Sequence, residues 1–154
     1  GITELPRAVL MAGYKDTSSS DAVYMLDWYA YGIGKVPAKV ATTYQNISDA
    51  WSLLIDQKWH DRITAIKAND GGLSYVEFFE YRKNKMSIPL FNIYCATGSN
   101  REYYAERTDL IQLGQTTQAI YFAKLTNEGE QSELALTGDE IKARFSLVNQ
   151  AWNN

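Results

Sequence analysis

The chain contains one histidine, His60, and Asp56 lies four positions before it. Two side chains at this spacing share one face if the segment is helical. An aspartate and a histidine placed in this way could work as an acid–base pair or supply two ligands to a metal ion. Asp61, Lys58 and Arg62 lie beside them, as in an ordinary exposed charge network. Asp56 and His60 are therefore the two catalytic candidates, and a solvated surface is the alternative interpretation.

Other kinds of catalytic site find no match in the sequence. It has no glycine-rich phosphate loop, no Gly-Lys-Ser/Thr triplet and no Gly-x-Ser-x-Gly nucleophile elbow. The carboxylates of Glu77, Glu80 and Glu106 are interpreted as solvent-facing partners of basic residues rather than as a catalytic acid pair. The one cysteine, Cys95, lies in an apolar run and is expected to be buried. We expect no cofactor and no metal.

The charge pattern excludes some partners. The net charge is −3, and acidic and basic residues are spread evenly along the chain. Nucleic-acid binding requires a basic stripe, and the only basic cluster is the short run 82–85. No stretch approaches the roughly 20 apolar residues of a membrane span. The chain starts at Gly1, so we expect a processed protein or an excised domain, from which any signal peptide or anchor helix would already have been lost.

Aromatic residues are the main excess in the composition, with 11 Tyr, 4 Trp and 5 Phe. Tyrosine and tryptophan combine a large apolar surface with a polar group, which suits both cores and recognition surfaces. The candidates for contact with a partner protein are Trp28, Tyr31, Tyr81, Tyr103 and Tyr104.

The first half of the chain shows apolar residues at helical spacing. The pattern predicts a helix over 21–31, which ends at the glycines of 32–34. A longer apolar stripe with 3–4 spacing runs from Val40 to Ile66 and predicts one bent helix or two. At 69–72 the pattern changes to short runs rich in Tyr and Phe.

The second half has the composition of strands. Runs over 73–81, 87–96, 102–113 and 118–125, with a weaker one over 132–136, are separated by turn residues and predict an antiparallel meander. Thr137 and Glu140 have the spacing of a capping box and predict a C-terminal amphipathic helix that reaches Trp152. The expected fold class is therefore α+β. N-terminal amphipathic helices precede a curved, mainly antiparallel sheet of four to five strands, and the C-terminal helix packs on it. One domain is expected over 1–154, with a loosely ordered lead-in over 1–20.

These features favour a non-catalytic protein–protein interaction or assembly domain. The composition suggests the soluble, extracytoplasmic part of an envelope or surface complex. Its partner would be another protein or a second copy of the chain. One alternative is a small ligand-binding protein or enzyme with a pocket between sheet and helices near Asp56 and His60. Another is a carbohydrate- or peptide-binding module that uses exposed Tyr and Trp.

Overall fold

A computed structural model describes residues 3–10, 24–83 and 85–148, and the chain is mostly β, with 55% strand and 16% helix. The expected order of N-terminal helices before a sheet is wrong, because the segments predicted to be helical form strands. These segments are rich in Tyr, Trp, Thr, Val and Ile. Such branched and aromatic side chains fit the pleated surface of a sheet better than a helix.

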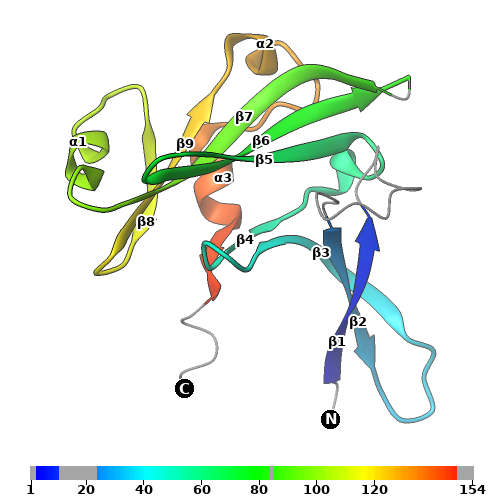
Figure 1. Cartoon of the computed structure of the whole chain (residues 1–154). Coiled ribbons are helices and arrows are strands. Elements are labelled where there is room, and N and C mark those ends of the chain that lie inside the picture. The colour runs from blue at the N-terminus through cyan, green and yellow to red at the C-terminus, as the bar shows by residue number, and fades with distance from the viewer. Residues whose placement is uncertain (1–2, 11–23, 84, 149–154) are drawn as a thin grey trace.

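The described residues form two five-stranded antiparallel sheets (Figure 1). The first sheet has the order β1-β2-β3-β4-β10, with bounds Thr3–Leu10, Tyr24–Tyr31, Ala38–Asn46, Trp51–Leu54 and Phe145–Leu147. The second has the order β5-β6-β7-β9-β8, with bounds Ile63–Asp70, Leu73–Arg82, Lys85–Thr97, Ala119–Leu125 and Ile111–Gln115. The helical segments are short: η1 (Gln57–Trp59), α1 (Arg101–Ala105), α2 (Asn127–Glu130) and α3 (Gly138–Arg144). None of the described helices is long and apolar enough to cross a membrane.

The long apolar stripe of the first half is divided among four elements, β3, β4, η1 and β5. Tyr44, Trp51 and Trp59 are buried because each lies on the inward side of a different element. The turn between β3 and β4 and the helical turn at η1 separate them by numbers of residues that imitate a helical period. Val40 and Ile47, which the helical pattern also included, are exposed.

The predictions for the second half are closer to the structure. β6, β7 and β9 coincide with three predicted strands. The change from helical to strand structure predicted at 69–72 is wrong, because both sides of this point are strands of the β5–β6 hairpin, where Asp70 pairs with Leu73. Gly71 has a φ of 63° in this turn, a conformation that favours glycine. The predicted strand over 102–113 instead divides into α1 and β8. The weak strand over 132–136 is wrong, because the described chain there forms no strand.

The capping box is confirmed. The Thr137 hydroxyl accepts a hydrogen bond from the Glu140 amide at 3.1 Å, and the Glu140 carboxylate accepts one from the Thr137 amide at 3.1 Å. The helix ends at Arg144, earlier than predicted, since the chain then pairs with β4 as strand β10. Trp152, at the end of the predicted helix, lies outside the described residues.

The main core lies between the two sheets. Tyr44 packs edge-on against Phe78, with ring centroids 5.5 Å apart, and Phe78 stacks on Phe91 at 4.8 Å. Helix α3 contacts β4, β8 and β9 and buries Ile141 against the same core. The C-terminal helix therefore packs on the sheets, as predicted, although it is short.

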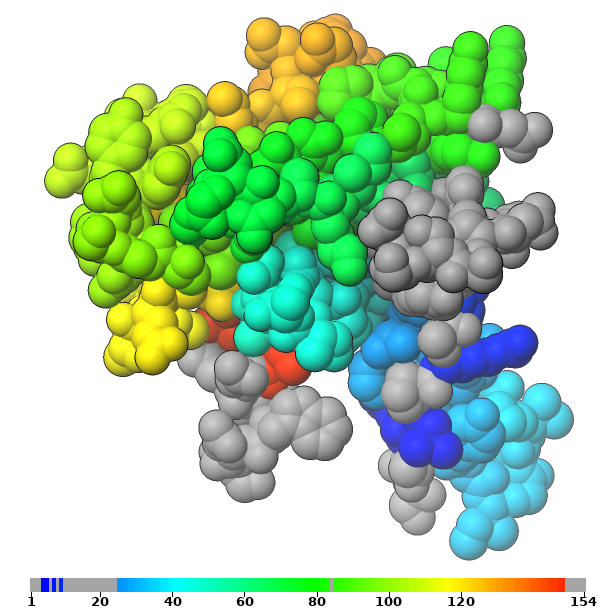
Figure 2. All heavy atoms as spheres, viewed as in Figure 1, coloured from blue at the N-terminus to red at the C-terminus, as the bar shows by residue number. Residues whose placement is uncertain are grey.

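Part of the first sheet extends beyond this core. We call it the arm, and it comprises β1, β2, the loop 32–37 and residues 38–42 of β3. Figure 1 shows the arm pointing away from the body, and Figure 2 shows it as a separate projection. Its first strand, Thr3–Leu10, comes from the segment expected to be a lead-in.

Candidate functional site

An open groove of about 680 Å³ lies where the arm meets η1 and the end of α3. We call it the arm groove. Its apolar lining comes from the arm and from the chain around η1, and comprises Val9, Met25, Val40, Leu54, Ile55 and Trp59. Its charged or titratable lining comprises Asp27, Lys39, Asp56, His60, Asp61 and Arg144. The groove therefore combines an apolar floor with charges of both signs.

The floor of the groove is the edge of the main core. Met25, Ile55 and Trp59 are all buried members of that core and also line the groove. The Trp59 indole N–H donates to the Leu134 carbonyl at 2.8 Å, and its ring stacks on Phe91 at 5.7 Å. This anchoring makes the floor a fixed part of the fold.

Asp27 lies on the wall that the arm provides. Thr42 faces it across the β2–β3 pair, and the Thr42 hydroxyl donates to Asp27 Oδ1 at 2.7 Å. Lys39 Nζ lies 3.0 Å from the same oxygen. Burial by itself would raise the pKa of Asp27, but the hydrogen bonds from Thr42 and Lys39 and the charges of Lys39 and His60 bring it below its ordinary value of 3.8. The carboxylate is thus an ionised acceptor.

Asp56 and His60 lie at opposite ends of η1, and both line the groove. Asp56 Oδ1 accepts a hydrogen bond from the Lys58 amide at 3.0 Å, and Asp56 Oδ2 lies 2.6 Å from Arg144 Nη2. The His60 side chain is 69% exposed, and its Nε2 lies 3.4 Å from a carboxylate oxygen of Asp61, which is 67% exposed. Asp56 and His60 do not share a helix face as predicted, because η1 is one short 3₁₀ turn. Each of them pairs with another residue instead, Asp56 with Arg144 and His60 with Asp61.

The arrangement is suited to binding. Each of the three groove carboxylates pairs with a basic group, and the apolar floor offers a surface from which water is displaced. Within residues 3–10, 24–83 and 85–148, no three His, Cys, Asp or Glu side chains gather closely enough to hold a metal ion.

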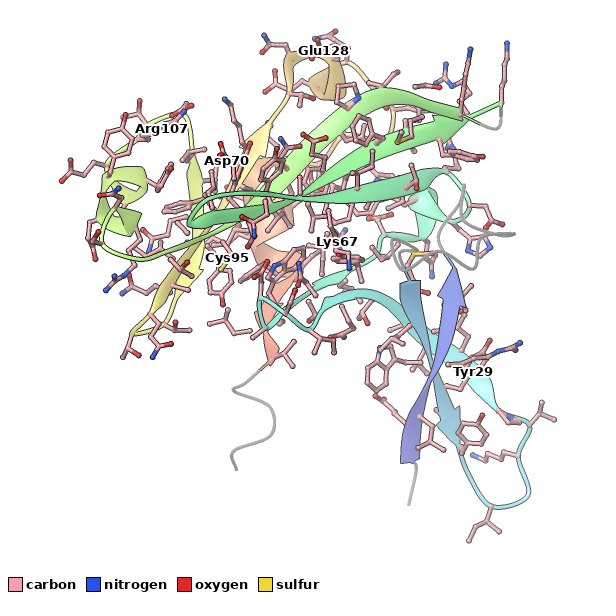
Figure 3. All side chains as sticks on the ribbon, in the orientation of Figure 1. Tyr29, Lys67, Asp70, Cys95, Arg107 and Glu128 are labelled. Carbon is pink, nitrogen blue, oxygen red and sulfur yellow. The ribbon has the colours of Figure 1, made fainter. Side chains whose placement is uncertain are left out.

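The five aromatic partner-binding candidates fall in three separate places. Trp28 and Tyr31 are on the arm strand β2, Tyr81 is near the end of β6, and Tyr103 and Tyr104 are on α1. Figure 3 shows Tyr29, which lies between the first two in sequence, on the arm and far from the body. Of these five, Tyr103 and Tyr104 are in contact, with ring centroids 5.5 Å apart. Trp28 and Tyr31 are three positions apart on β2 and therefore point to opposite faces of the sheet.

Cys95 and Glu80 lie outside the groove and were also interpreted from the sequence. Cys95 is buried, as expected. Glu80 has a basic partner, as expected, but the prediction that it faces solvent is wrong. Its carboxylate is buried and accepts hydrogen bonds from Arg82 at 2.5 Å and from Ser132 at 3.3 Å.

Several groove and arm residues were missed from the sequence. Arg144 lies 88 positions from Asp56, and no local pattern connects the two. Ile33 and Val36 were not identified as exposed, because they lie in a stretch that was interpreted as the end of one helix and the start of the next. Two apolar residues between glycines and a proline are also the pattern of an exposed hairpin loop, and this was the available signal.

The chain was also compared with known proteins. No protein-family model, no curated protein and no solved structure matches it. The function is therefore inferred from the geometry of the arm and the arm groove.

Proposed function

We propose that this chain is a non-catalytic interaction domain that binds a segment of another protein in the arm groove and along the arm. The observation that carries this proposal is the exposed apolar tip of the arm. Ile33 is 98% exposed and Val36 is 88% exposed in the loop that joins β2 to β3. Grouped apolar side chains on a projecting element are typical of an interaction surface.

The register of the arm supports a continuous binding face. Leu5 pairs with Tyr29, and Val9 pairs with Met25, which lies in the floor of the groove. Directly paired residues, and residues two apart along a strand, point to the same face of a sheet. The face of Leu5 and Tyr29 therefore continues into the apolar floor, and Asp27 lies on it between them.

The charges along this face indicate the chemistry of the partner. Asp27 with Lys39 and Asp56 with Arg144 place both signs of charge beside apolar surface. An extended segment that carries apolar residues together with at least one charged residue matches such a surface. In interfaces of this kind the buried apolar contacts supply most of the affinity, and the charges at the rim set the orientation.

Site-specific photo-crosslinking tests the proposal. A photoreactive residue placed at position 33 is expected to capture a discrete partner from an extract of the native source. The matched control is position 47, because Ile47 is 78% exposed but lies in the turn after β3, away from the arm. The double variant Ile33→Ser, Val36→Ser should reduce capture from a third arm position, Leu5. Equal capture at 33 and 47, or capture unchanged in the double variant, would contradict the proposal.

A small-molecule ligand is the second candidate, and the groove volume favours it. A volume of about 680 Å³ lies within the range of about 300–1,000 Å³ that is usual for such sites. Native mass spectrometry of the chain purified from its own source would show a bound small mass in this case. A ligand lost in Val40→Trp, which narrows the groove, but retained in Ile33→Ser would favour this candidate. The carbohydrate hypothesis and the extracytoplasmic location stay predictions from composition.

A further inference from the structure

A second cavity lies far from the arm groove, between α1 and the outer face of the second sheet. It has a volume of about 130 Å³, and we call it the α1 pocket. Leu73, Tyr94 and Phe122 form its wall on the strands, and Tyr104 and Leu110 form the wall on the chain that crosses them. These five side chains belong to a hydrophobic cluster separate from the main core. The pocket is therefore an apolar space with its own walls.

Two cations complete the lining of this pocket. Arg107 and Lys124 both line it, and both pair with one carboxylate, that of Asp109. The Arg107 guanidinium donates to the two carboxylate oxygens at 2.9 and 2.5 Å, and Lys124 Nζ lies 3.6 Å from one of them. Two positive charges and one negative charge leave an excess of one positive charge at the apolar cavity.

The Tyr94 hydroxyl adds a hydrogen-bond donor to the wall of the pocket. It accepts a hydrogen bond from the Asn92 side-chain amide at 3.0 Å. Its own proton has no hydrogen-bond acceptor among the residues that the structure describes, so the hydroxyl is free to donate to a ligand. An anionic oxygen is the strongest acceptor for such a donor.

We propose that the α1 pocket binds a small organic anion, namely a carboxylate carried on one aromatic ring or a short alkyl group. The apolar walls take the ring, and Arg107 and Lys124 pair with the carboxylate beside Asp109 or in its place. The size agrees, because an apolar cavity of roughly 150 Å³ holds one benzene molecule. This site shares no residue with the arm groove, so the inference goes beyond the proposed function and does not depend on it.

Nuclear magnetic resonance titration with benzoate tests the site directly. Benzoate should give saturable shifts at Leu73, Leu110 and Phe122. It should bind at least about threefold more tightly than benzamide, which has the same ring without the charge. Acetate, which has the charge without the ring, should bind more weakly than benzoate. A short peptide that ends in phenylalanine with a free carboxylate, compared with its amide, distinguishes a peptide terminus from a free small acid as the source of the anion.

Two variants separate anion binding from a purely structural role of the charges. Lys124→Gln should weaken benzoate binding roughly threefold, whereas Lys67→Gln, which removes an exposed charge from β5, should leave it unchanged. Asp109→Asn removes the competing carboxylate and should tighten binding by a similar factor, although it breaks the internal ion pairs. Equal affinities for benzoate and benzamide, weaker binding in Asp109→Asn, or shifts that never saturate would each overturn the proposal.

Discussion

The carboxylate of Asp56 lies 2.6 Å from the guanidinium of Arg144, and this contact joins the start of η1 to the last residue of α3. The other carboxylate oxygen of Asp56 accepts a hydrogen bond from the Lys58 amide, as a helix cap does. One side chain thus both caps η1 and ties it to the C-terminal helix beside the arm groove. In the structure this residue, selected from the sequence as a catalytic candidate, positions one wall of the groove.

Replacing Asp56 should lower the stability of the fold. Asp56→Ala removes the cap and leaves the partly buried Arg144 charge without its partner, so we expect a loss of about 2 kcal/mol in the free energy of unfolding. Urea denaturation followed by tryptophan fluorescence measures it. The matched control is Asp61→Asn, which removes a mostly exposed carboxylate, keeps a residue type that tolerates the positive φ of 56° at this position, and should cost less than about 0.5 kcal/mol. Equal losses in the two variants would contradict the assigned role.

Asp27 should make the stability of the fold dependent on pH in the acid range. Its pKa in the folded state lies below the ordinary value of 3.8, so the ionised carboxylate stabilises the fold above pH 3.8. This contribution is lost as the pH falls through the folded-state pKa. The difference in unfolding free energy between the wild type and Asp27→Asn should therefore be constant above about pH 5 and shrink toward pH 2. Thr42→Val removes one hydrogen-bond donor to Asp27 and should therefore show a smaller loss of stability with the same dependence on pH. If the difference in unfolding free energy between the wild type and Asp27→Asn did not depend on pH, this account would be refuted.

Cys95 should be unreactive in the folded protein. Burial, followed by the charge of Asp49, raises the pKa of this thiol to about 11, so almost none of the reactive thiolate is present near neutral pH. Ellman's reagent should label native protein very slowly and should label protein in guanidinium chloride rapidly. The native rate should keep rising above pH 9. Rapid stoichiometric labelling of the native protein would show that Cys95 is accessible.

The two tryptophans with indole hydrogen bonds should differ in their contribution to stability. Trp59→Phe leaves the buried Leu134 carbonyl without its donor and opens space in the core, so we expect a loss of about 2–3 kcal/mol. Trp28→Phe breaks a bond to Thr43 on the partly buried arm and should cost about 1 kcal/mol. Thermal and urea unfolding of both variants provide the comparison. A larger loss for Trp28→Phe would show that the arm, rather than the floor of the groove, limits stability.

Strands in the second half of the chain were predictable because their signals are local. β6, β7 and β9 are short runs of branched and aromatic residues bounded by turns, and each run carries its own preference for extended backbone. The first half misled the prediction for an equally local reason. The β3–β4 turn and the helical turn η1 separate the buried Tyr44, Trp51 and Trp59 by spacings that imitate the period of a helix.

The candidate site was predictable only in part. The sequence directed attention to Asp56 and His60, and the structure places both on one groove. It gave no indication of Asp27, Lys39 or Arg144, because these residues reach the groove through strand pairing and helix packing between distant segments. The exposure of Ile33 likewise depends on the arm extending beyond the second sheet.

By itself, the sequence determined strands β6, β7 and β9 and the capping box of α3, since each depends on residues close together in the chain. Only the tertiary structure decided that the first half pairs as strands, that one sheet extends as an arm and that a groove forms at its base. The physical reason is that strand pairing and ion pairs such as Asp56–Arg144 join residues that are far apart in the chain. The free energy that favours these contacts depends on both partners, so a local sequence pattern cannot report it.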